Sequence, residues 1–168
     1  MIKQSTLLPI DRFTDTLKIV QKEGMHLQFS WQRIFTNEIN ANWVQALDGQ
    51  PEVAEQLEAF VSRFGRMQDT IADKLLPRWL NALAENAGSQ IEVLNRAERL
   101  GVIQNVENWL VARKLRNRLV HEYIEAPETF AEDLLLAKEY SLMLIETYNQ
   151  LQNYAQTKMQ APQLPNKL

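Results

Sequence analysis

The chain has 168 residues, of which 45% are hydrophobic and 23% charged, and its formal net charge is -3. These values are typical of one folded domain with a real core. They exclude a disordered chain and a general nucleic-acid coat protein, which needs a broad basic surface. The absence of cysteine excludes disulfides, thiolate metal sites and a cysteine nucleophile.

The N-terminal stretch, MIKQSTLLPIDRFTDTL, lacks the long apolar run and the small-residue cleavage site of a signal peptide. No segment approaches the ~20 apolar residues that are needed to span a bilayer. We therefore expect a cytoplasmic protein without a membrane segment.

In the first half of the chain, apolar residues recur at helical spacing, and no useful stretch alternates with period two. A short helix is expected over residues 10–24 and a second one over residues 27–47. A long third helix is expected to begin at Pro51, since Pro favours the first turn. Pro77 should kink or restart this helix, and a C-cap is expected near Gly88.

In the second half, Ser89 is the expected N-cap of the next helix, with Glu92 as its capping-box partner and Gly101 as the stop. Two further helices are expected, one over about residues 105–124 and one over about residues 128–154.

The predicted fold is therefore all-α: an antiparallel bundle of about five to six helices joined by short turns. Residues 1–155 should form a single domain, and residues 156–168 should form a flexible tail with little to bury.

One short stretch, RKLRNRLVHEY, concentrates basic residues in an acidic chain. Its cations are Arg113, Lys114, Arg116 and Arg118, and His121, one of two histidines in the chain, follows them. At ~100° per residue, Trp109, Ala112, Leu115 and Leu119 share one apolar side, and Arg116 lies at its margin. Arg116 and His121 would lie ~140° apart around the helix axis and ~7.5 Å apart along it, so both can flank one groove.

These residue types suit phosphodiester chemistry. A guanidinium offers a rigid fork of donors that matches phosphate oxygens. A histidine titrates near neutral pH and can take or give a proton. The plainer interpretation is a solvated basic helix face.

Other residues favour structural roles. Arg63, Arg66 and Asp69 are spaced for weak ion pairs within one helix, with support of a groove from a neighbouring helix as the alternative. His26 has no carboxylate partners that would suggest a metal site. The tryptophans, at positions 31, 43, 79 and 109, have the spacing of core residues.

The string from Arg116 to Tyr123, RNRLVHEY, resembles the signature of the HEPN superfamily, in which Arg and a polar residue are followed by three more residues and then His. The Tyr two residues after the His is similar to the R-x-x-x-x-H-x-Y pattern of the HepT-like toxin branch. The resemblance covers about residues 51–151, where the motif ends one long helix and a final helix closes the bundle.

This resemblance implies a metal-independent endoribonuclease that needs no cofactor and acts as a homodimer, with two motifs facing each other across a cleft. In this mechanism the RNA 2′-hydroxyl attacks the adjacent phosphate. The two copies of His121 serve as base and acid, Arg116 stabilises the transition state, and Asn117 orients the phosphate or the imidazole. The remaining cations of the stretch, Arg113, Lys114 and Arg118, would bind RNA phosphates.

The resemblance also implies a partner, a minimal nucleotidyltransferase antitoxin that transfers AMP to Tyr123. The added charge and bulk beside His121 would silence the toxin by repelling RNA. Two alternatives stay open from the residues themselves. One is a non-catalytic nucleotide- or substrate-binding partner subunit of a nucleotidyltransferase, and the other is a structural helical adaptor.

Overall fold

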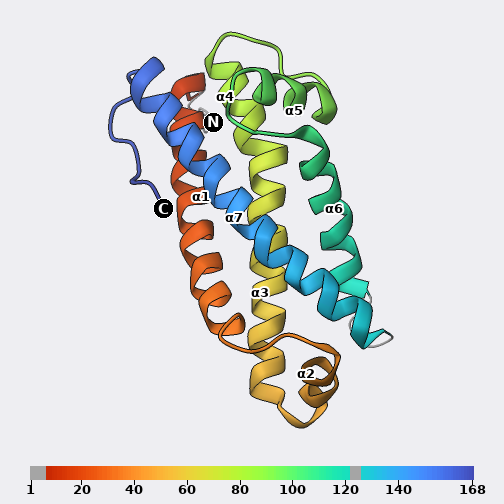
Figure 1. Cartoon of the computed structure of the whole chain (residues 1–168). Coiled ribbons are helices and arrows are strands. Elements are labelled where there is room, and N and C mark those ends of the chain that lie inside the picture. Colours follow the sequence, from red (N-terminus) through yellow and green to blue (C-terminus); the bar gives the residue numbers. More distant parts are fainter. Residues whose placement is uncertain (1–6, 122–125) are drawn as a thin grey trace, which may run out of the picture.

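The computed structural model describes residues 7–121 and 126–168, with the backbone alone at His121. Throughout these residues the fold is all-α, as predicted, and no strand is present. Long helices that follow one another along the chain run in opposite directions (Figure 1). The helices are α1 (Pro9–Ile34), α2 (Ala41–Ala46), α3 (Pro51–Thr70), α4 (Leu76–Ala82), α5 (Gln90–Arg99), α6 (Val106–His121) and α7 (Pro127–Lys158).

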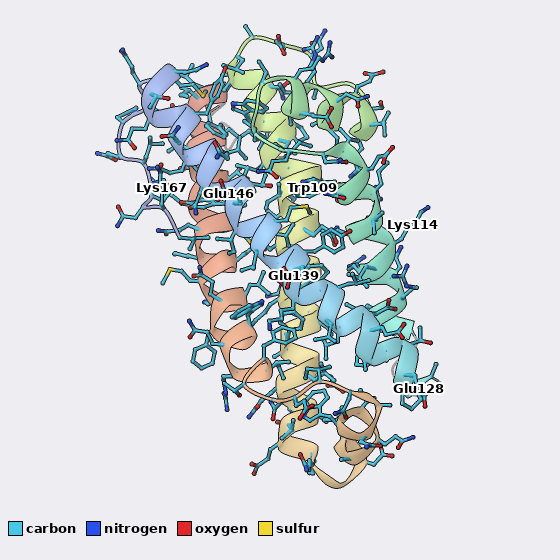
Figure 2. The ribbon with its side chains drawn as sticks, viewed as in Figure 1. Trp109, Lys114, Glu128, Glu139, Glu146 and Lys167 are labelled. Atoms are coloured by element: carbon cyan, nitrogen blue, oxygen red, sulfur yellow. The ribbon has the colours of Figure 1, made fainter. Side chains whose placement is uncertain are left out.

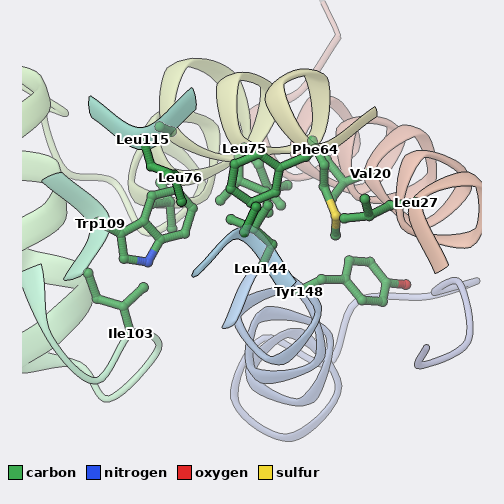
Figure 3. Packing of buried hydrophobic residues seen from close by; sticks show 14 of the residues in the cluster. Val20, Leu27, Phe64, Leu75, Leu76, Ile103, Trp109, Leu115, Leu144 and Tyr148 are labelled. Carbon is green, nitrogen blue, oxygen red and sulfur yellow. The ribbon is translucent and has the colours of Figure 1, made fainter. Parts of the chain in front are cut away.

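The core lies where α1, α3 and α7 meet and continues towards α6. α1 packs against α3, α4 and α7, whereas α6 packs against α3 and α7. In Figure 1, α7 crosses the front of the bundle diagonally, and α2 lies at the end opposite α5. α7 buries one apolar stripe in this core: Phe130, Leu134, Ala137, Leu144, Tyr148 and Leu151. Figure 3 shows Leu144 and Tyr148 packed near Phe64 and Leu75.

The first part of the chain differs from the prediction of two helices over residues 10–24 and 27–47. A single helix, α1, runs from Pro9 to Ile34, and only the short α2 follows it. Gly24 does not end α1. It is buried within the helix, where a Cβ would collide with the side chain of Leu168. This glycine provides close approach rather than a turn.

The long third helix begins at Pro51, as predicted, and runs on as α4 to Ala82 through a π-helical turn, Ile71–Leu75. This turn precedes Pro77 and accommodates the missing N–H and the bulk of its ring. The expected C-cap near Gly88 is wrong. Ala84 takes the left-handed conformation (φ 61°) and the Glu85 N–H bonds to the Leu80 carbonyl at 3.0 Å, which puts the C-cap at Leu83.

The predicted boundaries of α5 are confirmed. Ser89 and Glu92 form a complete capping box, and Gly101 follows the helix with a φ of 77°. In the described part of the chain, no helix has both the length and the apolarity needed to cross a bilayer.

The C-terminal segment was expected to be a flexible tail, but in the structure it lies against α1 and α7. The Tyr148 hydroxyl donates to the Asn166 carbonyl at 2.6 Å. The side chain of Asn149 accepts from the Leu168 N–H at 2.8 Å and donates to its carbonyl at 3.2 Å. The side chain of Leu168 packs beside Gly24. The tail therefore has both polar and apolar partners in the fold.

Candidate functional site

The helix that carries the basic stretch, α6, is fixed at its start and along one side. The Glu98 carboxylate accepts from the Val106 N–H at 2.7 Å, and the Asn105 side chain accepts from the Asn108 N–H at 3.2 Å. These bonds satisfy N–H groups that the first helical turn leaves unpaired. The predicted apolar side is confirmed, because all its members are buried: Trp109, Ala112, Leu115 and Leu119.

A groove of about 690 Å³ lies between α3 and α6. Its apolar walls come from both helices and from Phe130 at the start of α7. The lining residues are Leu57, Glu58, Val61, Ser62, Gly65, Arg66, Asp69, Thr70, Asp73, Lys74, Arg116, Leu119, Val120 and Phe130. The sequence places Arg116 at the margin of the apolar side, and the structure confirms that it borders a groove.

Arg116 is held in the groove by two residues of α3. Its guanidinium pairs with the Asp69 carboxylate at 3.0 Å, with both side chains more than a third exposed, so the pair is screened and weak. The same side chain crosses the helix beside Gly65, where a Cβ would stand 2.8 Å from the Arg116 Nε. The guanidinium is therefore positioned by one ion pair and one glycine while staying open to solvent.

The basic and acidic side chains that line the groove are equal in number. Three lining side chains are basic, Arg66, Lys74 and Arg116, and three are acidic, Glu58, Asp69 and Asp73. Positive potential therefore depends on local geometry and not on an excess of cations. A nucleic-acid channel usually shows such an excess.

A half-buried carboxylate lies behind the groove wall. The Thr70 hydroxyl lines the groove and donates to the Glu23 carboxylate of α1 at 3.0 Å. Burial raises the pKa of Glu23, and the Thr70 hydrogen bond with the charges of Arg66 and Lys74 opposes that shift only in part.

The other predicted site residues of α6 whose side chains are described do not line the groove. Arg113 donates to Gln90 of α5. Lys114 points away from the bundle (Figure 2), and Asn117 is also exposed. Arg118 forms a two-pronged pair with Asp133 of α7, with both N–O distances at 3.0 Å. Asp133 is buried, so this pair docks α6 on α7.

His121 is the last residue of α6, so the backbone places it less than two turns beyond Arg116. Its side chain and the whole of Tyr123 lie outside the described residues. Their predicted roles as proton-transfer group and AMP acceptor stay predictions.

The sequence offered the α3 wall of the site only as an alternative interpretation. Asp69 was expected in a pair within its own helix, but it reaches Arg116 on α6, as the alternative of groove support had allowed. Arg63 instead faces α1, where it donates to the Ser30 hydroxyl at 2.8 Å. The available signal was Gly65, a glycine in a helix interior, where Ala is more stable unless space is needed.

Among the described residues, no group of three or more His, Cys, Asp or Glu side chains could hold a metal ion. Comparison of the chain with protein-family models, with curated proteins and with solved structures finds no match.

Proposed function

We propose that this chain is a HEPN-type endoribonuclease toxin that cleaves RNA without a metal ion and is paired with a minimal nucleotidyltransferase antitoxin. The observation that carries the proposal is the position of Arg116. Its guanidinium lines an open groove, and the same helix ends at His121 five residues later. Arg116 thus lies beside a space that can admit a ligand.

The proposed reaction is transesterification. The RNA 2′-oxygen bonds to the adjacent phosphorus and its proton passes to one His121. The bond to the 5′-oxygen breaks, and this leaving oxygen takes a proton from a second His121. A 2′,3′-cyclic phosphate and a 5′-hydroxyl result. Arg116 offers its fork of donors to the phosphate oxygens, whose charge grows in the transition state. A phosphate there would compete with the Asp69 carboxylate for the guanidinium.

In this proposal the remaining predicted site residues of α6 differ in how available they are to RNA. Asn117 and Lys114 are exposed on the same helix and are available to RNA. Arg113 and Arg118 are engaged with Gln90 and Asp133, so their contribution to RNA binding requires that they share or leave these partners. A cytoplasmic location would fit an RNA substrate.

A second function, a nucleotide- or substrate-binding subunit of a nucleotidyltransferase, is favoured by the balanced charge of the groove. Three cations and three anions suit a small phosphate ligand better than a long polyanion. This subunit would use Arg116 to hold phosphate and would have no proton transfers to perform.

The test is cleavage of an end-labelled RNA by the purified full chain in EDTA. Wild type should produce cyclic-phosphate ends, and His121→Ala should lower the rate by roughly 10²–10⁴-fold, the scale of a lost general acid or base. Arg116→Ala should be similarly damaging. Arg99→Ala, which removes an exposed cation from α5, is the matched control and should leave the rate unchanged.

Undiminished cleavage by His121→Ala, or loss of activity with EDTA, would contradict the mechanism. Nucleotide binding that depends on Arg116 without any cleavage would favour the binding subunit. The proposed silencing is tested by intact mass after co-expression with the nucleotidyltransferase: an adduct of AMP size should form on wild type and be absent from Tyr123→Phe.

A further inference from the structure

The outward face of α7 carries leucines and glutamates at seven-residue spacing. Leu135 and Leu142 are 43% and 51% exposed, although the opposite stripe of the helix is buried. The acidic residues at this seven-residue spacing, all exposed, are Glu132, Glu139 and Glu146. At ~100° per residue these five side chains fall within ~80° of the helix surface and span ~21 Å along it. They form one continuous strip, here called the α7 strip.

The charges of the α7 strip have a single sign. None of its three glutamates makes an ion pair with another described residue. The nearby cation of the same helix, Lys138, holds its ammonium over the rings of Trp31 and Phe35, at 5.7 and 5.5 Å. Figure 2 shows Glu139 and Glu146 on the helix that crosses the front of the bundle.

Hollows flank the strip on both sides of Leu142. One, of about 400 Å³, lies between α7 and the segment that leads into α6, and it is lined by Glu139, Glu146 and Met143. The other, of about 150 Å³, lies towards α1 and is lined by Trp31 and Ile145. Leu142 borders both hollows. A helix laid along α7 could therefore insert side chains on either side of its leucines.

We propose that the α7 strip is the docking surface for a basic amphipathic helix of a partner protein. Apolar positions of that helix would cover Leu135 and Leu142, and Lys or Arg beside them would meet the glutamates. A second copy of this chain is disfavoured, because two-fold pairing of the strip brings glutamates against glutamates. RNA is repelled by the same charges. The proposal is independent of the ribonuclease activity.

The test uses two fluorescent helical peptides of about 21 residues as probes, both with Leu at the a and d positions of the heptad. The basic peptide carries Lys at e and g, and the acidic peptide carries Glu there. The full chain should bind the basic peptide at least about tenfold more tightly, measured by fluorescence anisotropy at about 0.15 M salt. The double variant Glu139→Lys, Glu146→Lys should lose this affinity by about tenfold or more and gain affinity for the acidic peptide.

Two controls separate docking from general attraction to an acidic chain. The variant Glu52→Lys, Glu55→Lys changes the net charge equally on exposed positions of α3, and it should keep binding within about twofold. Leu142→Ser leaves the charge unchanged. Because it removes an apolar contact, it should weaken binding of the basic peptide by about tenfold.

Equal affinity for the two peptides would overturn the proposal. An equal loss in the α3 control would do the same, because binding would then follow net charge alone. A dimer of the full chain that Leu142→Ser dissociates would assign the α7 strip to a second copy, which also overturns it.

Discussion

At the scale of the residue, the ribonuclease proposal depends on Arg116 and on what holds it. An arginine side chain has many rotamers, and its position at the groove is defined by Asp69 and by the space above Gly65. Because the pair with Asp69 is exposed, it contributes little to stability and serves mainly to orient the guanidinium. Two residues of α3 that lie outside the motif, Asp69 and Gly65, can therefore control the position of its arginine.

Gly65→Ala should separate stability from activity. In a helix interior Ala is more favourable than Gly by about 0.5–1 kcal/mol, yet a Cβ here stands 2.8 Å from the Arg116 Nε, so the flexible arginine must move. We expect a melting temperature at or above that of wild type, with metal-free RNA cleavage reduced. Gly49→Ala is the control, because a Cβ there meets nothing within 4 Å. Full cleavage by Gly65→Ala would show that this position of the guanidinium is not the active one.

At the scale of the element, the sequence predicted best where a local signal decides the boundary. The capping box at Ser89 lies at a helix start because it satisfies N–H groups that the first turn leaves unpaired. The prolines at positions 51 and 127 lie at helix starts because the N–H that proline lacks would be unpaired there. Gly24 and Gly88 misled. Gly24 lies inside a helix, where it allows close approach of Leu168, and the helix before Gly88 already closes at the left-handed Ala84.

In the candidate site too, a local pattern predicted one part, and tertiary packing determines the other. Helical periodicity was enough to place Arg116 beside the buried side of α6. The opposite wall requires α3 to lie against α6, a packing between segments about fifty residues apart that no local pattern encodes. The C-terminal tail is similar, since its partners on α1 and α7 become neighbours only in the folded chain.

The contact between α1 and α3 contains a pH-dependent element, Glu23. Burial raises its pKa in the folded chain above the usual 4.5, so the native state binds a proton more tightly than the unfolded state does. This contribution to the free energy of unfolding is fully present below about pH 4.5 and is lost as the pH rises through the raised pKa.

Glu23→Gln cannot ionise and should avoid that loss. Wild type and variant should have similar free energies of unfolding at pH 4, and the variant should be the more stable one at pH 7, measured by urea denaturation. Glu38→Gln, at an exposed position, should show no such divergence. A variant that is less stable than wild type at pH 7 would show that the Thr70 hydrogen bond and the neighbouring cations outweigh burial.

At the scale of the whole molecule, the charged surfaces are segregated. The groove between α3 and α6 holds mixed charges around Arg116, whereas the α7 strip is uniformly acidic. A phosphate ligand and a basic protein helix would therefore select different faces of one small bundle. Binding at one face would leave the other accessible, so a protein partner on α7 and a phosphate ligand in the groove would not exclude each other.

The proposed chemistry also requires two chains. Two protons must move, and of the two histidines, His26 is exposed on α1, which contributes no described residue to the groove. A two-fold dimer that joins the ends of α6 supplies the second His121. Val120, which is 56% exposed and lines the groove, immediately precedes His121 and should be covered in that dimer.

We therefore expect light scattering at micromolar concentration to give twice the 19.5 kDa chain mass. Val120→Asp should dissociate the dimer and abolish cleavage together, since it places a charge on the apolar surface that the dimer would cover. Val111→Asp is the matched control: this residue is also exposed on α6, but lies ~180° around the helix from Val120. It should leave both mass and cleavage unchanged. A strict monomer that still cleaves RNA would contradict the two-histidine mechanism, and equal dissociation by the two substitutions would place the interface elsewhere on α6.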